Sequence, residues 1–140
     1  MEISGDLRIL KNLNWKFNAT LSDNKIASFH EYIDDWDTWG KVDSIYTNTD
    51  IAFSPSIIAS SQLVYSPFNS DKKGVLELAF ITKYIGEQFI DNTSSIYAKL
   101  DDYVVNDFRM SYSIKNKLFK EIILSSWIRN LFNKNYISNA

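Results

Sequence analysis

The segment Leu13-Asn-Trp-Lys-Phe-Asn-Ala-Thr-Leu21 alternates strictly between apolar and polar residues. Its odd positions carry Leu, Trp, Phe, Ala and Leu, and its even positions carry Asn, Lys, Asn and Thr. Successive side chains of a β-strand point to opposite faces of the sheet. The alternation therefore predicts a strand that has one apolar face and one polar face.

The same period of two recurs along the chain. It is clear at 75–88 and at 104–114, and it is less regular at 56–66 and at 121–133. Aromatic residues make up 15% of the sequence, and such residues favour strands. These segments predict an all-β fold in which about five long strands form an antiparallel meander.

The predicted connections alternate in length. Short polar turns are expected at 69–74 and 115–120, whereas 27–55 and 91–102 form longer links. The strands would run for about 9–15 residues, against about 5–6 in most soluble sheets. Long strands with short turns at one end and long loops at the other are typical of outer-membrane barrels. We therefore expect part of a transmembrane β-barrel, with a soluble sandwich or a lipocalin-like barrel as the alternative.

Composition narrows the possible functions. The 15 basic and 17 acidic residues give a net charge of −2, which argues against a nucleic-acid partner. With no Cys and only one His, the chain cannot form a thiolate site or a two-His zinc site. The four glycines form no phosphate loop, and no apolar run is long enough for a transmembrane helix. We expect no enzyme activity, no cofactor and no metal.

Five segments of the chain resemble TonB-dependent outer-membrane receptors of Bacteroidetes type, and they occur in the family's order. Three of them fit compact motifs: K-Y-x-G-x-Q-x-x-D-N-T at 83–93, L-x-x-Y-x-x-N-D-x-R-x-S-Y at 100–112, and N-L-F-[ND]-x-x-Y at 130–136. Segments 18–37 and 50–56 resemble a strand with its outer loop and the return into the next strand.

The resemblance implies a role in transport. Such receptors close about 22 strands around a plug, and TonB energises the uptake of a large nutrient into the periplasm. Residues 1–140 would be a C-terminal barrel portion that lacks the plug, the TonB-binding segment and the final strand. The implied partners are outer-membrane lipid, the rest of the barrel with its plug, and the TonB complex. The ligand would be a siderophore–iron complex, haem, cobalamin or a glycan. The alternative function is a soluble β-sandwich carbohydrate-binding module.

Two groups of residues are candidate functional sites. The outer loop 29–50 is acidic and rich in Trp, and its expected ligand contacts are His30, Asp35, Trp36, Asp37 and Trp39. It departs from a calcium-binding EF-hand because Trp39 and Tyr46 occupy ligand positions. A polar network facing the barrel lumen is expected from Lys83, Asp107, Arg109 and Arg129. The residues expected to face lipid are Trp15, Phe17, Leu76, Leu78, Phe80, Phe108, Met110 and Tyr112.

Overall fold

A computed structural model describes residues 1–70, 74–116 and 118–138. The chain is all-β, with ten strands and one short 3-10 helix among these residues. The strands are β1 (Glu2–Leu10), β2 (Leu13–Leu21), β3 (Lys25–Asp35), β4 (Gly40–Asp50), β5 (Ile57–Ser70), β6 (Gly74–Ile85), β7 (Gln88–Phe89), β8 (Lys99–Leu100), β9 (Tyr103–Asn116) and β10 (Lys120–Ile128). The 3-10 helix η1 (Ile96–Ala98) precedes β8.

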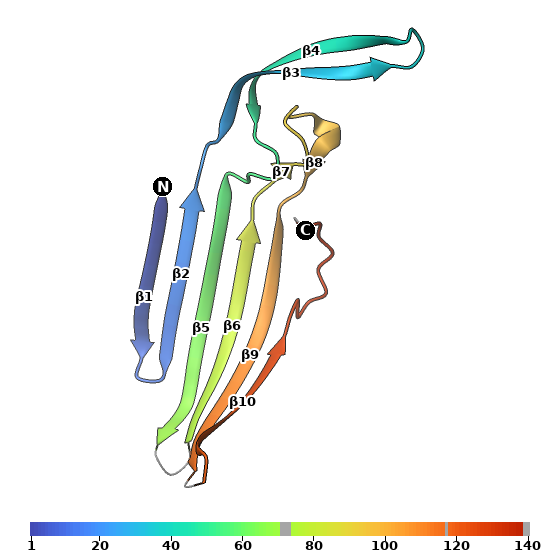
Figure 1. Ribbon diagram of the computed structural model, residues 1–140. Coiled ribbons are helices and arrows are strands. Elements are labelled where there is room, and N and C mark those ends of the chain that lie inside the picture. Colours follow the sequence, from blue (N-terminus) through green and yellow to red (C-terminus); the bar gives the residue numbers. More distant parts are fainter. Residues whose placement is uncertain (71–73, 117, 139–140) are drawn as a thin grey trace.

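Six strands form the main sheet, in the order β1-β2-β5-β6-β9-β10, and each is antiparallel to its neighbours. The sheet is a single curved layer in Figure 1. β3 and β4 form a separate ribbon, and β7 pairs with β8. The prediction of about five strands was therefore too low. The described residues also form no closed barrel, because β1 and β10 each have a strand on one side only.

The predicted strand at 13–21 matches β2, and the segments at 56–66, 75–88 and 104–114 coincide with β5, β6 and β9. The segment at 121–133 was predicted too long, because β10 ends at Ile128. Asn130 and Asn133 have φ of 50° and 51°, a left-handed conformation that stops an extended strand.

The longer link expected at 27–55 is mostly β-structure. Most of that stretch is the β3–β4 hairpin, which projects beyond the end of the main sheet (Figure 1). Its strands pair without interruption from Phe29–Tyr46 to Asp35–Gly40. Trp39 in the connecting turn has φ of 56°, as tight hairpin turns require.

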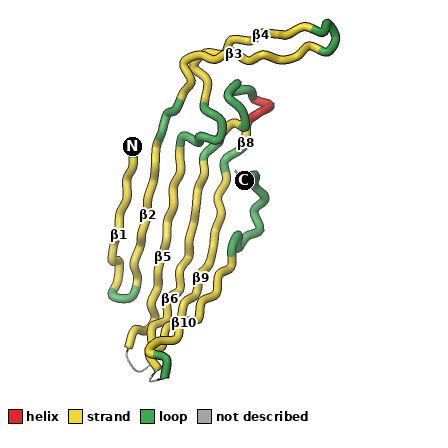
Figure 2. The backbone as a smooth tube through the Cα atoms, in the orientation of Figure 1, coloured by secondary structure: helices red, strands yellow, loops and turns green. Residues whose placement is uncertain are grey.

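Long and short connections lie at opposite ends of the main sheet, as the sequence predicts. The β3–β4 hairpin and residues 86–102 occupy one end, and the loops gather there in Figure 2. The β1–β2 turn, the end of β5, the start of β6, the end of β9 and the start of β10 lie at the other end. The predicted turns at 69–74 and 115–120 include residues 71–73 and 117, which lie outside the described residues.

The strand register gathers apolar side chains on one face of the sheet. Directly paired residues share a face, and one such row crosses the whole sheet. Its members are Leu7, Trp15, Leu63, Phe80, Phe108 and Ile128. The residues predicted to share the apolar face do share it. The opposite face carries polar rows such as Asn18, Ser60 and Lys83.

Neither face is covered by a second layer of described residues. Among the described residues, the hydrophobic core consists of Ala79, Ile85 and Ala98. The accessible surface is 10588 Å², whereas a compact monomer of this mass exposes about 7,500 Å². The sheet thus has no conventional core, and its apolar face is left open.

Candidate ligand-binding surfaces

The tip of the β3–β4 hairpin is a hydrogen-bonded turn that presents two indole rings. The carboxylate of Asp35 accepts hydrogen bonds from the Asp37 backbone N–H (3.0 Å) and the Thr38 hydroxyl (2.6 Å). These two hydrogen bonds, led by that of Thr38, lower the pKa of Asp35. Trp36 and Trp39 lie edge to face at 6.2 Å and expose 76% and 85% of their surfaces. Asp35 therefore holds the turn, while the indoles are open to a ligand.

His30 lies away from this tip. Its Nδ1 is 3.3 Å from Asp43 Oδ1, and its ring stacks with that of Tyr32 at 6.2 Å. Five residues of extended strand, roughly 17 Å, separate His30 from Asp35. The five predicted ligand contacts therefore divide into a group at the tip and a separate His30–Asp43 pair. Among the described residues, no three His, Asp or Glu side chains are arranged to hold a metal ion.

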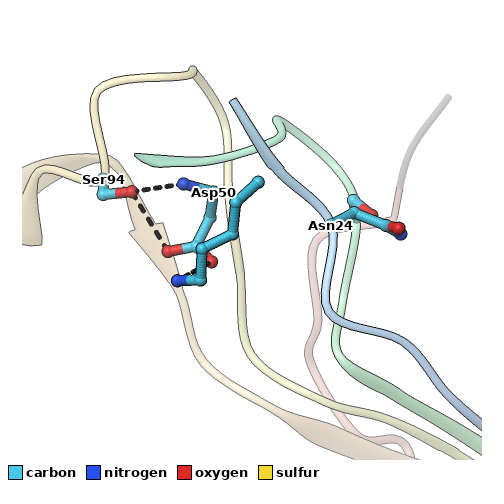
Figure 3. A network of polar contacts seen from close by, with 5 residues as sticks. Asn24, Asp50 and Ser94 are labelled. Carbon is cyan, nitrogen blue, oxygen red and sulfur yellow. Dashed lines mark hydrogen bonds and ion pairs between the residues drawn. The ribbon is translucent and has the colours of Figure 1, made fainter. Parts of the chain in front are cut away.

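A polar network at the base of the hairpin was not predicted. Lys25 Nζ lies 3.1 Å from Asp50 Oδ1, and the Ser94 hydroxyl donates to Asp50 Oδ2 at 3.1 Å. The Asp50 backbone N–H in turn donates to Ser94 Oγ at 2.7 Å (Figure 3). The hydrogen bond from Lys25 lowers the pKa of Asp50. This network ties the hairpin to the loop between β6 and β9.

The Asp-Asn-Thr segment of that loop has a structural role. Asp91 Oδ1 accepts hydrogen bonds from the Thr93 backbone N–H (2.9 Å) and hydroxyl (2.7 Å). Asn92 Oδ1 accepts a hydrogen bond from the Ala52 backbone N–H at 2.7 Å. The loop is further held by Lys99, which pairs with Glu87 at 2.6 Å and has its pKa raised by that hydrogen bond. These contacts fix the loop against the segment that follows β4.

Three of the four predicted lumen residues line one hollow on the polar face of the sheet. Lys83, Asp107 and Arg129 border this hollow of about 230 Å³, together with Tyr103 and Tyr136. Further lining comes from Ile81, Val105, Asn130 and Ser138.

The fourth predicted lumen residue, Arg109, shares the face but does not line the hollow. No ion pair joins Lys83, Asp107, Arg109 and Arg129 to one another in the described structure. The expected lumen-facing network stays a prediction. Asp107 accepts a backbone hydrogen bond from Asn130 instead, and the Arg129 guanidinium lies 4.7 Å above the Trp127 ring.

The described residues contain no helix with the length and apolar character needed to cross a membrane. No family model matches the chain, and no curated protein or solved structure matches it.

Proposed function

We propose that this chain supplies wall strands to the β-barrel of a TonB-dependent outer-membrane receptor of Bacteroidetes type. The receptor would take up a large nutrient ligand, such as a siderophore–iron complex, haem, cobalamin or a glycan, into the periplasm. The observation that carries the membrane part of this proposal is the open apolar face of a one-layer sheet. An aqueous solvent disfavours an apolar surface of that extent, and lipid would cover it.

The dimensions of the strands support the proposal. β5 and β9 each contain 14 residues, which corresponds to about 46 Å of extended chain. Tilted by about 45°, such a strand rises about 33 Å, enough for the apolar band of about 25 Å in outer-membrane barrels. The free edges of β1 and β10 would pair with further barrel strands, because lipid offers no partners to backbone N–H and C=O groups.

The placement of the loops supports an orientation. In barrels of this class, long loops lie outside the cell and short turns lie in the periplasm. The β3–β4 hairpin would then extend outward and present Trp36 and Trp39 to the ligand. The proposal that the plug and the TonB complex are partners rests only on the five sequence segments that resemble the family.

Spin labels can test the membrane assignment. The chain has no Cys, so single Cys substitutions along β6 give unique labelling sites. In lipid vesicles, labels at Leu78 and Phe80 should be relaxed by oxygen, which concentrates in lipid. Labels at Glu77 and Lys83 should be relaxed by a water-soluble nickel chelate.

The same label positions also test the soluble alternative. If the chain is monomeric and unfolds cooperatively in water without detergent, and if labels at Leu78 and Phe80 are shielded from both reagents, the barrel proposal is wrong. A second protein layer would then cover the apolar face, as in a sandwich.

A further inference from the structure

We infer that the hollow on the polar face of β6 and β9 binds a small oxyanion, either a carboxylate or a phosphate, between Lys83 and Arg129. The two cations line the same hollow from different parts of the chain. Lys83 lies on β6, and Arg129 directly follows the end of β10. This inference does not depend on the membrane proposal.

The charges of the hollow are unbalanced. Within the described part of the chain, neither Lys83 nor Arg129 forms an ion pair. Asp107 is the one described acidic residue in the lining, and its Oδ1 accepts the Asn130 backbone N–H at 2.8 Å. Two cations thus face one carboxylate that is already hydrogen-bonded. An oxyanion would satisfy both cations through charge-assisted hydrogen bonds.

The geometry of the hollow suits a small ligand. The chain after β10 borders the hollow, and the hydrogen bond from the Leu131 N–H to the Asn106 C=O at 2.7 Å holds it against β9. The rings of Tyr103 and Tyr136 stack at 4.5 Å and form its aromatic wall. The Arg129 guanidinium is oriented by its position above the Trp127 ring, so its donors are partly preorganised. A volume of about 230 Å³ admits phosphate or a short dicarboxylate.

The contact between Arg129 and Trp127 supplies a local reporter. The full chain, labelled with ¹⁵N in its Trp side chains and dissolved in detergent, is titrated with inorganic phosphate and separately with succinate. The indole N–H signal of Trp127 is assigned by its loss in Trp127→Phe. This signal should shift as anion is added and reach a plateau when the site is full, while the signals of Trp36 and Trp39 should not shift. Saturation by one anion alone identifies which oxyanion is preferred, and either result supports the site.

Variants separate this site from general charge attraction. Lys83→Gln and Arg129→Gln should each weaken binding about tenfold or more, because each removes a charged donor. Asp107→Asn keeps an acceptor for Asn130 and removes the negative charge, so it should tighten binding. Arg109→Gln is the matched control: the residue lies on the same face but outside the hollow, and its loss should leave affinity unchanged.

Three results would overturn the inference. One is the absence of a Trp127 shift with both anions at millimolar concentration. Another is unchanged affinity in Lys83→Gln and Arg129→Gln variants that keep the parent spectrum. The third is an equal loss of affinity in Arg109→Gln, which would indicate diffuse attraction to the sheet.

Discussion

Asp107 of β9 accepts a hydrogen bond from the main-chain N–H of Asn130 at 2.8 Å, and β10 has ended two residues before this contact. The Asn130 side chain continues the turn, because its Oδ1 accepts the Lys134 N–H at 2.8 Å and its Nδ2 donates to the Lys134 C=O at 3.0 Å. One carboxylate thus redirects the chain from the sheet edge over the polar face.

Removing that carboxylate should release the turn. Asp107→Ala deprives the Asn130 amide of its acceptor, and a hydrogen bond to a charged group contributes about 1.5–3 kcal/mol. Hydrogen exchange at Asn130 and Leu131 should accelerate about tenfold or more, while the amides of β6 keep their protection. Asp107→Asn is the control because it retains an oxygen acceptor. Unchanged exchange in the Ala variant would show that the backbone turn forms without Asp107.

Gly74 should be the glycine that is least tolerant of substitution. It begins β6 with φ of +78°, and a Cβ there would collide with the carbonyl oxygen of Ser113 on β9. Gly74→Ala should lower the free energy of unfolding by about 1–3 kcal/mol, as measured by urea titration in detergent. Gly40→Ala serves as the control, because a Cβ there meets only the Thr38 hydroxyl at 3.2 Å. Equal midpoints for the two variants would contradict this explanation.

Much of the sheet was predictable because its signal is local. Alternation in β2, β5, β6 and β9 identifies each strand without knowledge of its neighbours. β1 carries the same signal and could have been found, because Ile3, Leu7 and Ile9 occupy odd positions while Ser4, Asp6 and Arg8 occupy even ones. β3 and β4 were missed because the stretch that contains them is rich in acidic residues and has two Trp in its turn, which resembles a loop. Only their register shows that Phe29 and Tyr46 pair and stack at 5.1 Å.

The contacts of the candidate sites were less predictable because they join distant residues. Asp50 and Ser94 are 44 positions apart, and nothing in either local sequence indicates the other. Alternation correctly places Lys83, Asp107 and Arg129 on one face, because odd and even positions of a strand point to opposite faces. The hydrogen bond from the Asn130 N–H to Asp107 joins residues 23 positions apart, and no local pattern predicts it.

The hairpin base should loosen in acid. The hydrogen bond from Lys25 holds the pKa of Asp50 below its ordinary value of 3.8. A depressed carboxyl pKa contributes stability above the ordinary value, and this contribution is lost as the pH falls through the folded-state pKa. A ¹³C titration of the Asp50 carboxyl should therefore show a low midpoint, and Lys25→Gln should raise it.

Lys41→Gln is the matched control for this titration. Lys41 lies on the same hairpin, opposite Asp34, and forms no ion pair with any described residue. Its removal should leave the Asp50 midpoint in place. An equal rise in both variants would attribute the shift to overall charge and not to the 3.1 Å contact with Lys25.

Two adjacent residues of β5 allow the sharpest test of which face meets lipid. Leu63 lies on the apolar face between Trp15 and Phe80, and Gln62 lies on the polar face between Lys16 and Ile81. Arginine on a lipid-facing strand costs about 2–4 kcal/mol near the bilayer midplane. Leu63→Arg should therefore lower folding stability in vesicles by about that amount, and Gln62→Arg should change it by less than about 1 kcal/mol.

The same pair discriminates lipid from a protein layer. The stability cost of Arg on the apolar face should depend on its depth in the bilayer, because the cost of a charge on the lipid face falls to about 0–1 kcal/mol near the interfaces. Leu7→Arg, in the same row at the sheet edge, and Leu21→Arg, at the strand end, extend the series. A cost that follows depth along β2 and β5 fits lipid contact. If the loss of stability instead depends only on how tightly each side chain packs, and if it is the same without lipid, the apolar face contacts a protein partner.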